Sequence, residues 1–231
     1  MRAREPAVVS CEHGGNRVPA RWRPLFAGAA ELLASHRGWD PGSLVLARRI
    51  ARALGRPLLA HRVTRLLADA NRSRHHPRLF SELTRGLPAS EREGILTRCW
   101  APHRARVEAE LARRLRRGRR VFHLSVHSFT PVLHGVDRET DLALLYDPAR
   151  RSERALCARW SRLLRAAAPD LRVRRNHPYR GVADGLTTTL RRRFGPRYLG
   201  IELEVSQSLA ANEPARIGAL VIHTLRELGD S

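Results

Sequence analysis

Short apolar runs alternate with longer segments of helical spacing, and this alternation limits what the chain can fold into more than any other feature. The runs are typical of strands: AVVSC (7–11), PLLAHRV (57–63), VFHLSVHS (121–128), DLALLYD (141–147) and YLGIELEVS (198–206). Apolar residues recur at helical spacing over 43–54, Ser90 to about Gly118, 152–168 and 214–228. The pattern predicts an α/β fold in a single domain over residues 1–231, with a mostly parallel or mixed sheet flanked by helices.

Length and composition exclude several classes of protein. The chain has 231 residues and is 42% hydrophobic, which is enough for a buried core. No stretch reaches the ~18 apolar residues of a membrane span, and the first ten residues lack the apolar run of a signal peptide. Cys11, Cys99 and Cys157 have no CxxC spacing, which argues against a disulfide framework or a cysteine-based zinc site. We expect a cytoplasmic protein, with a long surface loop over 71–90.

The formal net charge of +21 favours anionic partners, and nucleic acid is one of them. However, all 43 basic residues are arginine, so codon bias is an alternative cause of the charge. The densest run, RRLRRGRR (113–120), ends a helical pattern, and aromatic residues make up only 5% of the chain. A basic nucleic-acid-binding protein on the same scaffold therefore stays as an alternative, with nucleic acid the less favoured partner.

Polar side chains gather where the expected strands end. Open α/β sheets bind ligands at the carboxyl ends of their strands. The residues at or just after these ends are His13, Asp69, Asn71, Arg72, His127, Ser128, Asn176, His177, Glu202 and Glu204. Two glycines follow His13 in the stretch SCEHGGN, and glycine lets a ligand approach the backbone closely. We therefore expect a functional site at this edge of the sheet.

Two histidines and a carboxylate are the ligands of many catalytic zinc sites, with water in the fourth position. A further glutamate can act as general base on that water. The chain has no HExxH motif, so it is not a metalloprotease of that class. The competing interpretation is a metal-free α/β hydrolase with Ser128 or Cys11 as nucleophile, although Ser128 lacks the GxSxG setting.

The chain resembles the N-formylglutamate amidohydrolase family. Seven pieces carry the resemblance, in the family's order and from about residue 8 to 207: SCEHGGNRVP, HRGWDPGSLVLAR, RLLADANRS, VHSFTPVLHG, LLYDP, NHPYRG and IELEVSQ. The resemblance implies a zinc-dependent amide hydrolase. It also implies a fold similar to the zinc carboxypeptidase and aspartoacylase group, which is of the phosphorylase/hydrolase-like type.

The resemblance implies a metal site with one zinc ion per chain. His13 in EHGGN and His127 in VHSF match the family's metal-site histidines. A carboxypeptidase-like HxxE spacing would place a glutamate at position 16, but the chain has Asn16. Asp40 in GWDPG is the preferred third ligand, with Glu12 as the alternative. Asp40 could instead cap the helix that follows it.

The resemblance also implies the catalytic residues. Glu204 in IELEVSQ matches the position of the general base, and Glu202 shares its face of the strand. His177 in NHPYRG is expected to help polarise the scissile carbonyl. The family shows a Pro-Tyr-His step where this chain reads WAPHRA, so we assign no role to His103.

The remaining residues would bind the substrate. Asn71 and Arg72 resemble the pair that holds the substrate carboxylate, a task that suits the guanidinium fork. Asp69 could orient Arg72 or a metal ligand. The other substrate-binding residues expected are Ser128, Asn176, Tyr179 and Arg180. The chain is thus expected to hydrolyse a small anionic N-acyl amino acid, with an N-formyl group favoured and N-formylglutamate the first choice.

Overall fold

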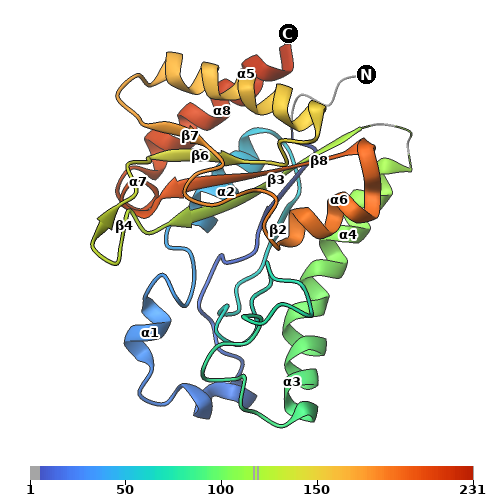
Figure 1. The fold of residues 1–231 in the computed structure, drawn as a ribbon, viewed down its shortest axis with the longest axis vertical. Helices are drawn as coiled ribbons and strands as arrows, with labels where there is room; N and C mark the ends of the chain where they lie inside the picture. The colour runs from blue at the N-terminus through green and yellow to red at the C-terminus, as the bar shows by residue number, and fades with distance from the viewer. Residues whose placement is uncertain (1–5, 117, 119, 231) are drawn as a thin grey trace.

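A six-stranded sheet forms the centre of the molecule (Figure 1). The structure, a computed structural model, describes residues 6–116, 118 and 120–230. In spatial order the strands are β2 (Leu58–Ala60), β1 (Val8–Cys11), β3 (Val121–Phe129), β8 (Tyr198–Ser206), β6 (Leu142–Leu145) and β7 (Val173–Arg175). The first four are mutually parallel, whereas β6 runs antiparallel to β8 and parallel to β7. The predicted mixed α/β sheet is confirmed.

Helices cover both faces of this sheet (Figure 1). One face packs against α2 (Ser43–Ala53), α5 (Arg151–Ala167), α7 (Gln207–Asn212) and α8 (Pro214–Asp230). The other packs against α4 (Ala101–Leu115) and α6 (Leu186–Phe194). No helix in the described part of the chain is long and apolar enough to cross a membrane.

The central strands carry apolar side chains on one face and polar side chains on the other. The face toward α2, α5 and α8 is apolar and includes Val9, Cys11, Leu124, Val126, Ile201, Leu203 and Val205. On the other face, toward the carboxyl ends of the strands, the alternate residues are polar and buried: Ser10, Glu12, His123, Ser125, His127, Glu202 and Glu204. Because side chains alternate along a strand, these polar groups share the face toward α4 and α6. The site is therefore built on that face.

The loop expected over 71–90 extends as far as 88, because residues 89 and 90 begin α3 (Ala89–Ile95), and it does not lie wholly on the surface. Leu79 and Thr84 are buried. Leu79 belongs to a second, smaller core that includes Trp22 and Leu67, and Thr84 donates to the backbone carbonyl of Leu67. Short helices at Ala20–Phe26 and at α1 (Ala30–Ala34) border this part of the molecule (Figure 1).

The helix expected from Ser90 to about Gly118 is interrupted. It forms α3, a π-helical stretch at Leu96–Trp100, and α4. The arginine run at 113–120 ends α4, where Arg113 and Arg114 both pair with Glu110, and positions 117 and 119 lie outside the described residues. The remaining elements are a hairpin of β4 (Val132–Leu133) and β5 (Val136–Asp137) and a 3₁₀ turn at Gly195–Arg197.

Candidate active site

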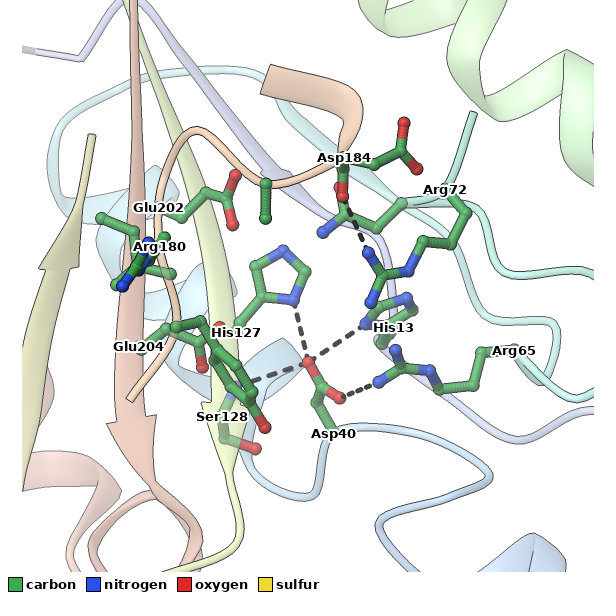
Figure 2. Close-up of a pocket in the computed structure, with 14 residues that line it drawn as sticks. His13, Asp40, Arg65, Arg72, His127, Ser128, Arg180, Asp184, Glu202 and Glu204 are labelled. Carbon is green, nitrogen blue, oxygen red and sulfur yellow. Dashed lines mark hydrogen bonds and ion pairs between the residues drawn. The ribbon is translucent and has the colours of Figure 1, made fainter. Parts of the chain in front are cut away.

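Two histidine rings converge on one aspartate at the carboxyl end of the central strands (Figure 2). His127 lies near the end of β3, and His13 follows β1. The Nδ1 atoms of His13 and His127 lie 3.3 and 2.9 Å from the same oxygen, Oδ2 of Asp40. All three side chains are buried. Within the described residues, these three form the group whose potential metal-ligating atoms lie within 4.8 Å of one another.

Asp40 does not cap the helix that follows it. The N-cap residue of α2 is Gly42, and no side chain caps this end. The Asp40 carboxylate instead turns toward the two histidines and the guanidinium of Arg65, whose Nη1 is 3.3 Å from Oδ1. The capping interpretation of Asp40 is wrong, and its side chain is available to a ligand in the site.

Each of the two histidines has a second carboxylate close to its other ring nitrogen, Nε2. Asp69 Oδ1 is 2.6 Å from Nε2 of His13, and Arg65 holds the other Asp69 oxygen through Nη2 at 2.7 Å. Glu12 Oε2 is 3.1 Å from Nε2 of His127. Glu12 is therefore on the side of the His127 ring away from Asp40, outside the group of potential ligands.

The buried charges hold one another in ionised form. Burial by itself would raise the pKa of Asp40, but His13 and His127 hold it well below its usual range. Burial would lower the pKa of His127, yet hydrogen bonds to Asp40 and Glu12 raise it well above its ordinary value. The cluster thus stabilises positive charge between carboxylates, as a cation-binding site requires.

Glu204 lies beside this cluster because β3 and β8 are neighbours. Their register pairs His127 with Glu204 and Ser125 with Glu202. Oε2 of Glu204 is buried without a hydrogen-bond partner among the described residues. Burial, with the nearby charges of Asp40 and Glu202, raises the pKa of Glu204 to about 8. Glu202 differs, because its carboxylate accepts a hydrogen bond from Thr187.

The cluster opens into a cavity of about 150 Å³ whose lining includes three arginines. Its lining comprises His13, Asp40, Arg65, Asn71, Arg72, His127, Ser128, Leu145, Tyr179, Arg180, Ala183, Asp184, Glu202 and Glu204. Arg72 Nη1 donates to the backbone carbonyl of Asp184 at 2.9 Å, which fixes its guanidinium at the cavity (Figure 2). Asn71 Oδ1 accepts from the backbone N–H of Leu186. The lining thus combines three arginines with four carboxylates.

The NHPYRG segment divides into residues that reach the cavity and residues that do not. Tyr179 and Arg180 line it, but Asn176 and His177 do not. Asn176 Oδ1 accepts from the backbone N–H groups of Tyr146 and Gly181, so its side chain shapes the loop. His177 is exposed, with Nδ1 2.7 Å from Thr140 Oγ1. Its placement gives no contact with the cluster.

The glycines after His13 have a packing role. A Cβ on Gly15 would lie 2.9 Å from the Arg62 carbonyl oxygen. The N–H of Gly14 donates to the carbonyl of His61. These glycines let the turn after β1 pack against the chain that follows β2, rather than clear space for a ligand.

In the described part of the chain, neither the Ser128 hydroxyl nor the Cys11 thiol forms a hydrogen bond with a side chain that could act as a base. The hydroxyl of Ser128 donates to the carbonyl of Pro41 at 2.7 Å. Cys11 is fully buried, and burial raises the pKa of its thiol to about 12. Its side-chain contact is Ser43 Oγ at 3.4 Å. The geometry therefore does not favour the metal-free hydrolase.

Sequence reasoning missed Arg65 and Asp184. Arg65 is one of 43 arginines, and its ion pair with Asp69 four residues later lies in a non-helical segment. Asp184 lies between two expected elements and contributes to the cavity through a backbone carbonyl, which no residue type signals. Arg65 is the first residue of the RLLADANRS stretch that resembles the family, and this was the signal available for it, whereas nothing in the sequence pointed to Asp184.

A mixed α/β sheet that presents a histidine–carboxylate cluster and a buried glutamate in one cavity is typical of hydrolase-type enzymes. Comparison with known proteins gives the family. The chain belongs to the N-formylglutamate amidohydrolase family, whose model matches residues 5–211. The chain is therefore an enzyme of a family that hydrolyses amides. The resemblance in the sequence is confirmed.

Two solved structures resemble the chain over nearly its whole length. A gene product of Agrobacterium tumefaciens is 30% identical with a TM-score of 0.82, over 99% of this chain and 92% of that one. The N-formylglutamate amidohydrolase of Ralstonia eutropha is 22% identical with a TM-score of 0.72, over 100% and 94%. At 22% identity, the likeness to the Ralstonia eutropha structure shows the fold alone. No curated protein matches the chain.

Proposed function

We propose that this chain is a metal-dependent hydrolase that cleaves the amide bond of a small anionic N-acyl amino acid, with N-formylglutamate the first substrate to test. One zinc ion per chain would be held by His13, Asp40 and His127. The observation that carries the proposal is the convergence of two histidine Nδ1 atoms on one Asp40 oxygen. Family membership supports the amide substrate.

The donor set fits a catalytic metal ion. Two imidazoles and one carboxylate are a common three-ligand set for zinc in hydrolases, and they leave a position open toward the cavity. Backing carboxylates on both histidines are the usual surroundings of such ligands. When bound, the ion would activate water and polarise the scissile carbonyl.

Glu204 is the group proposed to move the proton. Its Oε2 has no hydrogen-bond partner among the residues that the structure describes, and Glu204 lies opposite His127 on the neighbouring strand. A carboxylate so placed can take the proton from the attacking water and deliver it to the leaving amine. Because Glu202 is engaged by Thr187, Glu204 is better suited to this role.

The cavity's size and charge support a small carboxylate substrate. Arg72 is held at the wall by the Asp184 carbonyl and can bind a carboxylate in bidentate fashion. Arg180 lines the same cavity and is exposed. The net charge of +21 would attract small anions from solution.

The first test is metal content. Mass spectrometry of the purified protein is expected to give about one zinc per chain, because each chain has one such ligand set. The His13→Ala, His127→Ala double variant is expected to hold none. The zinc-loaded protein should hydrolyse N-formylglutamate when it is assayed with a panel of N-acyl amino acids. Wild-type protein that neither contains zinc nor takes it up would refute the proposal.

Replacement of Arg72 tests carboxylate binding. Arg72→Gln is expected to lower kcat/KM about 10- to 100-fold, mostly through KM, since a hydrogen bond to a charged group contributes about 1.5–3 kcal/mol. Arg74→Gln is the matched control, because Arg74 is exposed and pairs with Glu93 away from the cavity. Steady-state kinetics on both variants decide the point. Equal effects of the two substitutions would remove Arg72 from the substrate site.

A further inference from the structure

Glu12 is a fully buried carboxylate for which the proposed reaction has no direct use. It follows β1 and shares the polar face of the sheet with Ser125 and His127. Three donors surround it. Ser125 Oγ donates to Oε2, His127 Nε2 lies 3.1 Å from Oε2, and His103 Nε2 lies 3.4 Å from Oε1. A carboxylate hidden from water in this way needs such partners to stay ionised.

The position of Glu12 on the His127 ring is the informative feature. The two ring nitrogens of His127 face two different carboxylates, with Nδ1 toward Asp40 and Nε2 toward Glu12. A histidine that binds a metal must present a lone pair on one nitrogen and carry its proton on the other. An ionised carboxylate can only accept hydrogen bonds. Glu12 therefore favours the tautomer with the proton on Nε2.

His13 repeats the arrangement with a different carboxylate. Its Nε2 is 2.6 Å from Asp69 Oδ1, and its Nδ1 faces Asp40 at 3.3 Å. Asp69 is itself held by Arg65, as Glu12 is held by Ser125 and His103. The site thus has two imidazoles, each with Nδ1 toward the centre and each backed by its own anchored carboxylate. Because the arrangement is the same on both rings, we expect the two carboxylates to play the same role.

We infer that Glu12 is a positioning residue: it holds the Nε2–H of His127 and so presents the Nδ1 lone pair of that ring to the metal. Ser125 and His103 anchor Glu12 in turn, and this gives His103, on α4, a place in the site. The inference rests on the proposed function, because it concerns the metal held by His13, Asp40 and His127. It assigns Glu12 a role other than that of ligand.

The metal affinity of Glu12→Gln tests this inference. We expect zinc to bind about 10- to 100-fold more weakly, as for other changes behind a metal-ligating histidine, measured by competition with a chromophoric chelator. The visible spectrum of the cobalt-substituted protein should also change. Glu153→Gln is the matched control. Glu153 is also a fully buried glutamate, but it pairs with Arg191 away from the cluster, so its loss should alter thermal stability and leave zinc affinity unchanged.

Ser125→Ala is the second variant, in case Glu12→Gln does not fold. It removes the hydroxyl that donates to Glu12 and lies 2.9 Å from His127 Nε2, and we expect a smaller loss of zinc affinity in the same direction. Wild-type zinc affinity and an unchanged cobalt spectrum in a folded Glu12→Gln or Ser125→Ala protein would overturn the inference and leave the proposed function intact. Wild-type protein that binds no zinc would overturn both.

Discussion

Protein stripped of metal by a chelator is expected to lose hydrolysis of N-formylglutamate by at least about 1,000-fold, because a metal ion contributes several kcal/mol to such a reaction and each ~1.4 kcal/mol is tenfold in rate. Without the metal, His13 and His127 would both be hydrogen-bonded to Asp40, as the distances between these side chains allow. Adding about one equivalent of zinc should restore the activity. Initial rates before chelation, after it and after reloading provide the measurement.

The alternative, a metal-free hydrolase, predicts the opposite result in the same experiment. If Ser128 or Cys11 were the nucleophile, activity would survive the chelator and disappear in Ser128→Ala or Cys11→Ala. The structure gives Ser128 a backbone carbonyl as partner and leaves Cys11 sealed in the core. Chelator-resistant activity that depends on either side chain would therefore contradict both the mechanism and these contacts.

The sequence was sufficient to predict the main architecture. The five apolar runs correspond to β1, β2, β3, β6 and β8, and they miss β7. The helical segments correspond to α2, α4, α5 and α8. Periodicity predicts these elements because each buries a continuous face. The spatial order of the strands and the reversed direction of β6 and β7 depend on contacts between residues far apart in the sequence. No local sequence pattern indicates such contacts.

Helix α6 shows where local signals fail. Its sequence, LTTTLRRRF, has three consecutive threonines, which are poor helix formers. Leu186 and Leu190 nevertheless pack against Tyr198 in the core on the α4 side of the sheet. Burial of these side chains stabilises a helix that intrinsic propensity alone does not favour.

The two histidines were predictable because each lies at or after a strand end, whereas Asp40, between α1 and α2, was suggested only by the family resemblance, and the roles of all three needed the contacts. Glu12 was the alternative to Asp40 as third ligand on sequence alone, and the structure places it on the other side of the His127 ring. Ser125 was not selected at all. A signal for it existed: polar residues alternate with apolar ones in FHLSVHS, inside a strand that is buried along its whole length. Polar side chains in such a strand need partners, and here the partners form the site.

Replacement of Glu204 by glutamine is expected to lower kcat by about 100- to 10,000-fold, the usual range for loss of a general acid–base. Glutamine keeps the shape of the side chain but cannot take a proton from water. Zinc content should stay near the wild-type value, since Glu204 lies outside the group of potential ligands. The measurement combines kcat for N-formylglutamate with metal analysis of the same preparation.

Glu202→Gln provides the comparison for Glu204. The two glutamates lie two residues apart on the same face of β8, and both line the cavity. Glu202 already accepts a hydrogen bond from Thr187, whereas Glu204 Oε2 has no partner among the described residues. Glu204 also pairs in register with the proposed ligand His127, whereas Glu202 pairs with Ser125, so the loss in Glu202→Gln should be at least about tenfold smaller. If Glu202→Gln instead shows the greater loss of kcat with zinc still bound, the general base is Glu202, and the free oxygen of Glu204 has another explanation.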